Sequence, residues 1–367
     1  MRVLQVINSL GTGGAEKLLL ESLPIYNGRG IEVDLMVLDG EDFPFMQRLK
    51  SLKSIKIYSL NSNSVYNPFS LFKIIPYLKK YDLVHVHIFP SLYWVCLAKI
   101  VSFSNVKLIF TEHSSNNRRI SNSLYRIVDK FIYSKYNVIV SISKEVDAII
   151  RKHLGKIKCK FEIIENGVNL SKIQSEIAYD RFEIGFSLTE FDILLIQVSR
   201  FDHPKDQKTL INSLKLLPDN VKLLLVGDGE LRNQNEKLVA DLNLEARVFF
   251  LGVRMDVPKL LKTADVVILS SHYEGLSISS IEGMASGKPF VASDVPGLSE
   301  LVSGAGLLFP AGDAAVLAET IKSLIEDKEY ASCIADKCVA RSEKYDINVM
   351  VDKYIELYHE LVNNHSN

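Results

Sequence analysis

Residues 264–289, ADVVILSSHYEGLSISSIEGMASGKP, contain a short apolar run, a polar turn and a second apolar segment with a different period. The run VVIL at 266–269 predicts a strand that is buried in a parallel sheet. The polar turn that follows includes Gly275, where the strand is expected to end. A helix is predicted from about Ser277, with apolar positions at Ile278, Ile281, Met284 and Ala285. A strand, a turn and a helix in this order predict an α/β fold.

Two carboxylates flank this turn: Glu274 lies in the loop and Glu282 lies inside the predicted helix. A ligand beyond the carboxyl end of the strand would face the positive end of the helix that follows. Amide donors for a phosphate, together with two acceptors for hydroxyl groups, suit a sugar nucleotide. The alternative is that both glutamates are solvated surface charges, as most glutamates are.

The sequence Glu274-Gly275-Leu276, followed by Glu282, resembles the E-x7-E signature of the retaining glycosyltransferases of family 4. The resemblance covers nearly the whole chain. It implies the GT-B fold, in which two Rossmann-like parallel-sheet domains face each other across a cleft. Leu276-Ser277 stands where many members have an aromatic residue followed by Gly, so the resemblance does not identify the donor sugar.

Two domains are also expected from the length of 367 residues and from the alternation of strand and helix patterns. The resemblance implies an acceptor-binding domain over 1–168 together with a C-terminal helix at about 346–367. A linker is expected over 169–187 and a donor-binding domain over 188–345. The four scattered cysteines predict packing thiols in a reducing compartment. The first residues lead directly into a strand-like run, so no signal peptide is expected. The apolar stretch 87–103 is interrupted by Pro90 and Lys99, so no transmembrane helix is expected.

Charge is distributed unevenly, although the formal net charge of the chain is −1. Residues 1–165 carry 23 basic and 14 acidic side chains, whereas the remainder carries 20 and 30. Cations are interleaved with aromatic and aliphatic residues in FSLFKIIPYLKKY (69–81) and RRISNSLYRIVDKFIYSKY (118–136). This mixture suits an anionic membrane surface, and the alternative is helices with ordinary basic outer faces. Nucleic acid is not expected as a partner because no nucleic-acid-binding motif accompanies the charge.

Polar residues mark the carboxyl ends of several predicted strands in the first half. The first strand is followed by a glycine-rich loop that would let backbone amides approach a ligand, at Gly11, Gly13 and Gly14. Candidate acceptor-binding residues at strand ends are Asn8, His87 and Glu112. A histidine in a buried strand is more often a core residue, which is the alternative for His87. The resemblance assigns His113 to the donor sugar, since a neutral imidazole can donate or accept a hydrogen bond to a hydroxyl.

In the second half, Arg200 and Lys205 lie on the loop after a predicted strand. The resemblance implies that they clamp the diphosphate of the donor, where fixed cations would stabilise the departing negative charge without a metal. The alternative is two ordinary loop cations. The resemblance also places the nucleobase near Val253 and Arg254. The remaining candidate donor-binding residues are Gly13, Gly14, Gly227, Glu274, Gly275, Leu276, Ser277, Ile278 and Glu282.

The sequence therefore predicts a retaining, metal-independent glycosyltransferase with Glu274, His113, Arg200 and Lys205 as catalytic residues. A nucleotide-diphosphate sugar is expected as co-substrate, with UDP favoured over GDP and no other cofactor. The expected acceptor is a saccharide or polyprenyl-linked saccharide of surface polysaccharide biosynthesis, on the cytoplasmic face of a membrane. Two alternatives stay open: a sugar-nucleotide epimerase of the same architecture, and a non-catalytic nucleotide-sugar binding protein.

Overall fold

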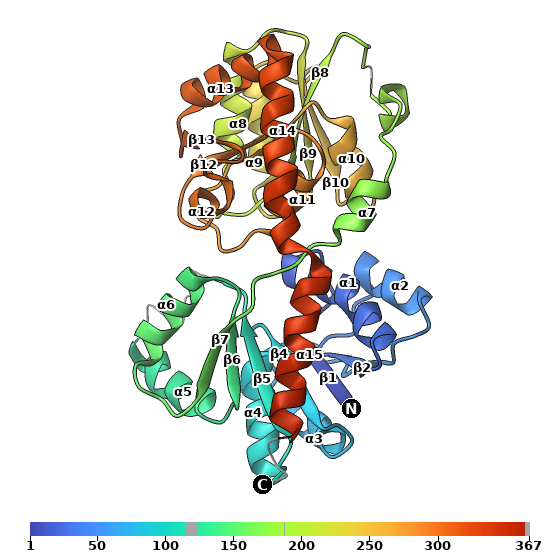
Figure 1. Cartoon of the computed structure of the whole chain (residues 1–367), viewed down its shortest axis with the longest axis vertical. Coiled ribbons are helices and arrows are strands. Elements are labelled where there is room, and N and C mark those ends of the chain that lie inside the picture. Colours follow the sequence, from blue (N-terminus) through green and yellow to red (C-terminus); the bar gives the residue numbers. More distant parts are fainter. Residues whose placement is uncertain (115–122, 187, 364–367) are drawn as a thin grey trace. The chain divides into compact units, whose positions relative to one another are not determined.

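The computed structural model describes residues 1–114, 123–186 and 188–363 of the chain. It divides into two compact units, which we call unit 1 (Met1–Gly167 with Ile347–Asn367) and unit 2 (Val168–Asp346). Figure 1 shows that each unit contains a sheet flanked by helices. Part of the basic segment 118–136 and the last residues of the C-terminal segment lie outside the described residues. No helix among those described is both long and apolar enough to cross a membrane.

The described residues of unit 1 form a seven-stranded parallel sheet in the order β3-β2-β1-β4-β5-β6-β7. Its strands are β1 (Arg2–Ile7), β2 (Glu32–Val37), β3 (Ile57–Ser59), β4 (Leu83–His87), β5 (Lys107–Glu112), β6 (Val138–Ser141) and β7 (Lys160–Ile163). Its helices are α1 (Gly14–Gly28), α2 (Pro44–Ser51), α3 (Ser70–Leu78), α4 (Ser91–Val101), α5 (Ser123–Tyr133), α6 (Lys144–Leu154) and α15 (Ile347–Asn363). The strand order reverses between β1 and β4, and ligands bind at this kind of switch point in open α/β sheets.

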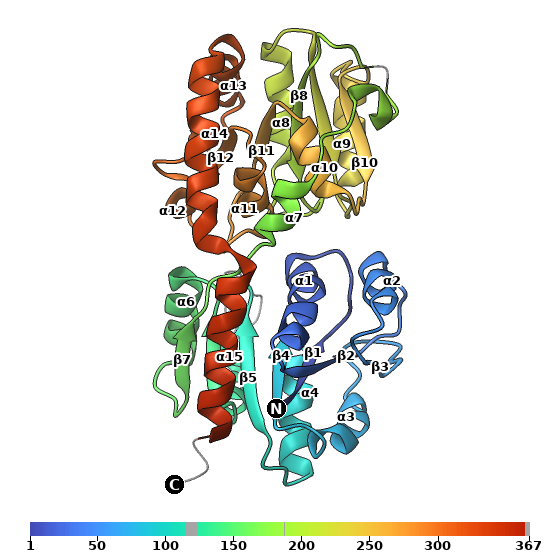
Figure 2. The ribbon, with the colours of Figure 1, turned by 45° about the vertical axis from the view of Figure 1, so that its right-hand side comes forward.

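The C-terminal helix α15 packs in unit 1, far in sequence from the strands that it covers. Tyr354 and Tyr358 are buried on its inner face and contact residues of β1, β4 and β5. Figure 2 shows α15 beside β5, and α15 also packs against α1. The helix therefore completes the core of a unit whose other residues all come from the first half of the chain.

Unit 2 contains a six-stranded parallel sheet in the order β10-β9-β8-β11-β12-β13, as far as its residues are described. Its strands are β8 (Ile193–Val198), β9 (Val221–Val226), β10 (Val248–Gly252), β11 (Val266–Leu269), β12 (Phe290–Asp294) and β13 (Leu307–Pro310). Its α-helices are α7 (Leu170–Ser175), α8 (Gln207–Ser213), α9 (Arg232–Asp241), α10 (Val257–Thr263), α11 (Ile278–Ala285), α12 (Leu298–Val302), α13 (Ala314–Glu326) and α14 (Lys328–Ser342). Short 3-10 turns are η1 (Arg181–Ile184), η2 (Leu214–Leu216) and η3 (Glu343–Tyr345). The order reverses between β8 and β11, which makes this the second switch point.

The segment 169–187, which the sequence suggests as a linker, contains α7 and η1 and groups with unit 2. Two apolar side chains of α7, Leu170 and Ile173, are buried. Arg181 of η1 makes a two-oxygen ion pair with Asp265, at 2.8 and 2.9 Å. The weak apolar pattern hides these elements because short helices need few buried residues. Residue 187 lies outside the described residues.

The glycine at 283 in α11 generates a stability prediction. A Cβ atom on Gly283 would lie 2.8 Å from the Phe290 ring and 2.9 Å from Val267. We expect Gly283→Ala to lower the free energy of unfolding of unit 2 by about 1–3 kcal/mol, because the helix must move away from the sheet. Alanine forms helix better than glycine by about 1 kcal/mol, so any destabilisation must come from overpacking. Thermal melting of the two proteins tests this.

The matched control is Gly28→Ala, at a helical glycine with no heavy atom within 4 Å of the added Cβ. This substitution is expected to leave the melting temperature unchanged or to raise it slightly. Equal effects of the two substitutions would contradict the close packing of α11.

Asp39, just after β2, generates a pH prediction. Burial first, and then the neighbouring Glu41, raise the pKa of its carboxyl from 3.8 to about 6. The folded state then binds this proton more tightly than the unfolded state, so stability falls as pH rises from 3.8 to about 6. We expect Asp39→Asn to stabilise the protein at pH 7 by about 1 kcal/mol, discounted for solvent screening, and to have no such effect near pH 4. Denaturant unfolding of both proteins at pH 4 and pH 7 measures the difference. Equal stabilisation at the two pH values would refute the account.

Candidate functional site

An ion pair between Lys205 and Glu274 lies at the centre of the candidate site in unit 2. Nζ of Lys205 contacts Oε1 of Glu274, and the side chains are only 13% and 11% exposed. Ser271, which the sequence analysis did not single out, donates to the same carboxylate oxygen at 2.8 Å. Two charges can be held away from water in this way because they are paired and the carboxylate has a further hydrogen bond.

The pair forms because two loops are joined by their backbones. One loop follows β8 and the other follows β11, and these strands are neighbours in the sheet. The amide of Asp206 donates to the carbonyl of Ser270 at 3.0 Å, and the amide of His272 donates to the carbonyl of Pro204 at 2.8 Å. The structure therefore brings together Lys205 and Glu274, which are 69 residues apart, at the switch point of the sheet.

Gly227 lies on the loop after β9, which packs tightly on the loop after β8. Its φ is +131°, and that of Gly229 is +155°. A Cβ atom on Gly227 would collide with the carbonyl of Ser199, and one on Gly229 would lie 2.5 Å from the carbonyl of Phe201. Only glycine fits both positions, because the backbones approach closely and φ is positive. These residues therefore have a packing role that the Gly-x-Gly pattern alone does not reveal.

Arg200 lies on the same loop as Lys205 but in a different environment. Its side chain is 63% exposed, and its guanidinium contacts Asp202 at 3.1 Å. An exposed ion pair of this kind contributes little to stability. Arg200 is therefore a cation at the surface of the loop, whereas Lys205 is held in place by Glu274.

Arg254 follows β10 and is held by two neighbours. Its Nε and Nη2 donate to the two oxygens of Asp256 at 2.8 and 2.5 Å, and the Tyr179 hydroxyl donates to the same carboxylate at 2.6 Å. These contacts lower the pKa of Asp256 to about 2, with the Arg254 hydrogen bond as the largest cause. Val253 beside it is 40% exposed.

The loop from Gly275 into α11 places the second carboxylate. Ser277 caps the helix by accepting from the amide of Ser280 at 3.4 Å, and Glu282 is only 3% exposed. The two residues that flank Ser277 are also buried, at Leu276 and Ile278.

Gly297, at the start of α12, is a site neighbour that the sequence analysis missed. Its φ is +84°, and a Cβ atom there would lie 2.5 Å from the carbonyl of Glu274. The Pro-Gly dipeptide in Val295-Pro296-Gly297 indicates a turn at this place in the sequence.

In unit 1, His113 and His87 lie together at the carboxyl ends of β5 and β4. His113 Nε2 is 3.0 Å from His87 Nδ1, and His87 Nε2 is 2.7 Å from Oε1 of Gln5. Burial lowers the pKa of His113 to about 4. Burial, and then the neighbouring histidines, lower the pKa of His87 well below its ordinary value. Both rings are therefore neutral at pH 7.

Gln5 also connects this pair to the C-terminal helix. Its Nε2 donates to the Tyr358 hydroxyl at 3.0 Å, and that hydroxyl is 2.6 Å from Nδ1 of His85. The other nitrogen of His85 is 2.7 Å from Oγ1 of Thr111, which contacts the Tyr354 hydroxyl at 3.0 Å. Tyr358 is 353 residues from Gln5, so no local pattern signals this contact.

The remaining candidates in unit 1 make internal contacts. Asn8 donates to the carbonyl of Phe89 at 2.7 Å and accepts from the Ser91 hydroxyl at 2.7 Å. Glu112 is buried and accepts from the Tyr133 hydroxyl at 3.0 Å. At the start of α1, a Cβ atom on Gly13 would collide with the Glu16 carboxylate, whereas Gly14 is the first residue of the helix.

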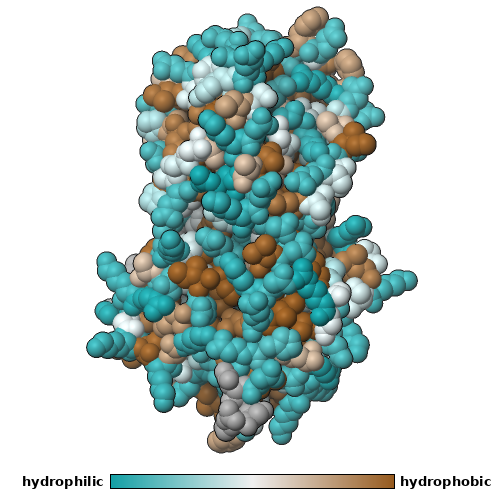
Figure 3. Space-filling model, in the orientation of Figure 1, coloured by the Kyte–Doolittle hydropathy of each residue, from teal (hydrophilic) through white to brown (hydrophobic). Residues whose placement is uncertain are grey.

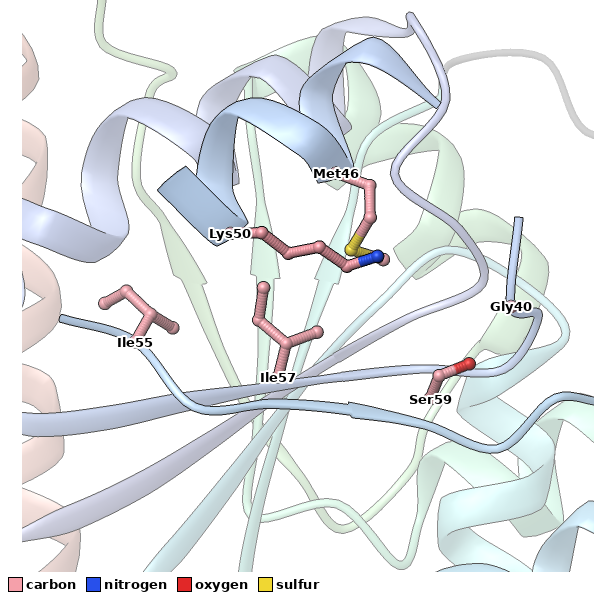
Figure 4. Close-up of a pocket in the computed structure, with 6 residues that line it drawn as sticks. All are labelled: Gly40, Met46, Lys50, Ile55, Ile57 and Ser59. Carbon is pink, nitrogen blue, oxygen red and sulfur yellow. The ribbon is translucent and has the colours of Figure 1, made fainter. Parts of the chain in front are cut away.

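A pocket of about 290 Å³ lies elsewhere in unit 1, and none of the predicted site residues lines it. Figure 4 shows Met46 and Lys50 reaching from α2 toward Ile57 of β3. The lining is completed by Gly40, Ile55 and Ser59. Lys50 forms an exposed ion pair with Asp42 at 2.7 Å.

Comparison with protein families identifies both halves of the chain. The model described as "Glycosyltransferase Family 4" matches residues 12–172, and the model described as "Glycosyl transferases group 1" matches residues 181–337. Together they cover most of both units.

Curated relatives carry related names. The Campylobacter jejuni N,N'-diacetylbacillosaminyl-diphospho-undecaprenol alpha-1,3-N-acetylgalactosaminyltransferase is 31% identical over 255 residues, which are 67% of this chain and 65% of that protein. The match thus spans slightly less than two thirds of that relative. The Escherichia coli UDP-Gal:alpha-D-GlcNAc-diphosphoundecaprenol alpha-1,3-galactosyltransferase is 28% identical over 312 residues, with 80% of this chain and 79% of that protein covered.

Solved structures share the fold. The Anabaena protein HepE, crystallised with UDP and glucose, has a TM-score of 0.83 and 22% identity, covering 98% of this chain and 100% of that one. The sucrose-phosphate synthase of Thermosynechococcus elongatus has a TM-score of 0.80 and 22% identity over 99% and 100% of the two chains. The family matches and the two parallel sheets confirm the predictions of family and fold class. The chain belongs to glycosyltransferase family 4 and has the two Rossmann-like domains of the GT-B fold.

Proposed function

We propose that this chain transfers a sugar from a nucleotide-diphosphate sugar to a lipid-linked saccharide, with retention of the anomeric configuration and without a metal. The observation that carries the proposal is the desolvated pair of Lys205 and Glu274 at the switch point of unit 2. The relatives from C. jejuni and E. coli are named for undecaprenol-diphosphate-linked acceptors, and the E. coli name specifies UDP-Gal. These names favour UDP over GDP and a role in surface polysaccharide assembly.

The first task of the site is to stabilise the departing nucleoside diphosphate. Lys205 provides a fixed positive charge, and Arg200 provides a second cation on the same loop. An ammonium group has three donors, so Lys205 can bind a phosphate oxygen while it remains bonded to Glu274. A fixed cation in a partly desolvated site stabilises developing negative charge without reorganisation. Unit 2 is accordingly the donor-binding domain, and unit 1 is the acceptor-binding domain.

The second task is to hold the transferred sugar, and Glu274 has a free oxygen for it. Oε1 accepts from Lys205 and Ser271, whereas Oε2 makes no hydrogen bond to any residue in the described part of the chain. Oε2 is therefore available to a sugar hydroxyl and can offset positive charge that develops at the anomeric carbon. We do not assign Glu274 as an attacking nucleophile.

Other residues complete the donor site in this proposal. Glu282 accepts from the ribose hydroxyls, and the loop at Val253 and Arg254 holds the base. Arg254 is kept in one orientation by Asp256, which suits stacking on a flat ring. His113 contacts the donor sugar from unit 1, with Asn8, His87 and Glu112 on the acceptor side.

We further propose that unit 1 binds an anionic membrane surface through α5, on the cytoplasmic side. The exposed side of this helix carries Tyr125, Ile127 and Phe131, of which Ile127 is 71% and Phe131 51% exposed. Cations accompany them: Arg126 is exposed, and Lys135 lies 4.9 Å from the Phe131 ring. Apolar side chains flanked by cations fit the boundary between acyl chains and anionic headgroups. On the face shown in Figure 3, apolar and hydrophilic side chains are interspersed.

Lys205→Met generates the central prediction. Loss of the cation should abolish thermal stabilisation by UDP and lower kcat by about 100-fold to 1,000-fold, as for removal of one fixed donor to a developing anion. Lys208→Met is the matched control, because Lys208 is exposed on the first turn of α8 only three residues away. The measurements are thermal shift with UDP, GDP and their sugars, and release of nucleoside diphosphate in the presence of acceptor. A Lys205 variant that binds UDP and turns over like the wild type would contradict the site.

Nucleoside diphosphate release, proton NMR of the donor sugar and thermal shift together distinguish a glycosyltransferase from the two alternatives. A glycosyltransferase releases nucleoside diphosphate in proportion to a lipid-linked acceptor that gains a sugar. An epimerase changes the donor sugar when no acceptor is present, which proton NMR of the sugar detects. A binding protein is stabilised by a nucleotide sugar but catalyses neither change.

The membrane proposal is tested with vesicles. Wild-type protein should sediment with phosphatidylglycerol vesicles and much less with phosphatidylcholine vesicles. Introducing Ile127→Glu and Phe131→Glu together should weaken binding by roughly tenfold or more, since two apolar side chains lose their burial in the interface. The control is Phe191→Glu in unit 2, a substitution at a side chain that is 76% exposed. Equal binding by the α5 variant and the wild type would refute the proposal.

A further inference from the structure

We propose that Gln5 and Tyr358 are positioning residues that fix which nitrogen of His113 carries the proton. They do so through a hydrogen-bonded chain of six residues, which we call the relay: His113, His87, Gln5, Tyr358, His85 and Thr111. The relay gives His113 an unprotonated Nδ1, which is a hydrogen-bond acceptor. It runs across β5, β4, β1 and α15, at the switch point of unit 1.

The orientation of the Gln5 amide sets which atoms donate and which accept along the relay. Nε2 of Gln5 donates to Tyr358, so Oε1 faces His87 Nε2 at 2.7 Å. A carboxamide oxygen can only accept, and His87 must therefore carry its proton on Nε2. A neutral imidazole has one N–H group, so Nδ1 of His87 accepts. The partner of this Nδ1 is Nε2 of His113, 3.0 Å away, and this nitrogen must be the donor.

The direction in the other arm follows from the same Gln5 orientation. The Tyr358 hydroxyl accepts from Gln5 and gives its single hydrogen to Nδ1 of His85 at 2.6 Å. His85 is then protonated on Nε2 and donates to Thr111 Oγ1 at 2.7 Å. From His87 to His85, each member accepts on one side and donates on the other, so one reversed contact would reverse all of them. Such cooperative chains hold buried polar groups in a single arrangement.

His113 is the exposed end of the relay, and the relay determines what its Nδ1 can do. His87 and His85 are 3% and 1% exposed, whereas His113 is partly exposed. Nδ1 of His113 has no hydrogen-bond partner among the described residues. Burial lowers the pKa of the His113 ring to about 4, so the ring is neutral at pH 7. If His113 contacts the donor sugar, as the proposed function holds, it accepts a hydrogen from a sugar hydroxyl and does not donate one.

The test reads the protonated nitrogen directly by NMR. The full chain is labelled with 15N-histidine, and long-range proton–nitrogen correlation assigns the tautomer of each ring; a His113→Gln variant identifies the signals of His113. We expect Nε2–H and an unprotonated Nδ1 in the wild type. Tyr358→Phe should produce a mixture of His113 tautomers, because Gln5 loses the acceptor that orients its amide. The matched control is Tyr354→Phe, one turn away on α15, which leaves every donor and acceptor between His113 and Thr111 in place.

Several results would overturn the relay: protonation of Nδ1 in wild-type His113, or unchanged His113 signals in the Tyr358 variant. Gln5→Met provides a second variant, because it removes the amide and should also give mixed tautomers. Kinetics test the link to function separately. Tyr358→Phe should lower kcat by roughly tenfold, as for other buried partners that orient a histidine, with KM for the donor nearly unchanged. A correct NMR result without a kinetic effect would reject the role of His113 in transfer while the relay itself stands.

Discussion

The carboxyl edge of a parallel sheet determines where chemistry can gather in this protein. All paired strands of each sheet run in the same direction, so their carboxyl ends meet along one edge, and the chain leaves a gap where its strand order reverses. In unit 2, Lys205 and Glu274 lie at this edge. In unit 1, His87 and His113 lie there, and Gln5 inside β1 is hydrogen-bonded to His87. Close-packed glycines let the loops after β8 and β9 approach each other, and the distant C-terminal helix supplies Tyr358 to the polar cluster of unit 1.

The two units solve the problem of burying polar groups differently. In unit 2, opposite charges compensate each other, and Ser271 adds a hydrogen bond. In unit 1, the groups are neutral, and each donor meets an acceptor along a chain of side chains. A charged pair suits a ligand whose negative charge grows during reaction. A neutral relay suits the recognition of hydroxyl groups, whose hydrogen bonds depend on direction more than on charge.

The sequence was sufficient for the fold class and for most of the βα units, because long alternating apolar runs have a strong period. It also placed Lys205 and Glu274 on loops after predicted strands, and the structure pairs them. It was not sufficient for Gln5 and Tyr358, since a glutamine inside a strand and a tyrosine inside a helix are unremarkable until the fold makes them neighbours. The helix α7 was missed for a different reason, because six residues with two buried side chains give no clear period.

The charge distribution can now be assigned to separate parts of unit 1. The histidine cluster carries no positive charge at pH 7, because burial lowers the pKa of His113 to about 4. The basic excess in the sequence of unit 1 therefore comes from its Lys and Arg side chains. Exposed cations lie instead on α3 and α5, at Lys73 and Arg126, beside exposed apolar side chains such as Phe72 and Ile127. A ring kept neutral in this way suits hydrogen bonding to a hydroxyl group. The proposed function assigns stabilisation of the departing diphosphate to the cations of unit 2, and the proposed membrane contact to exposed cations of unit 1.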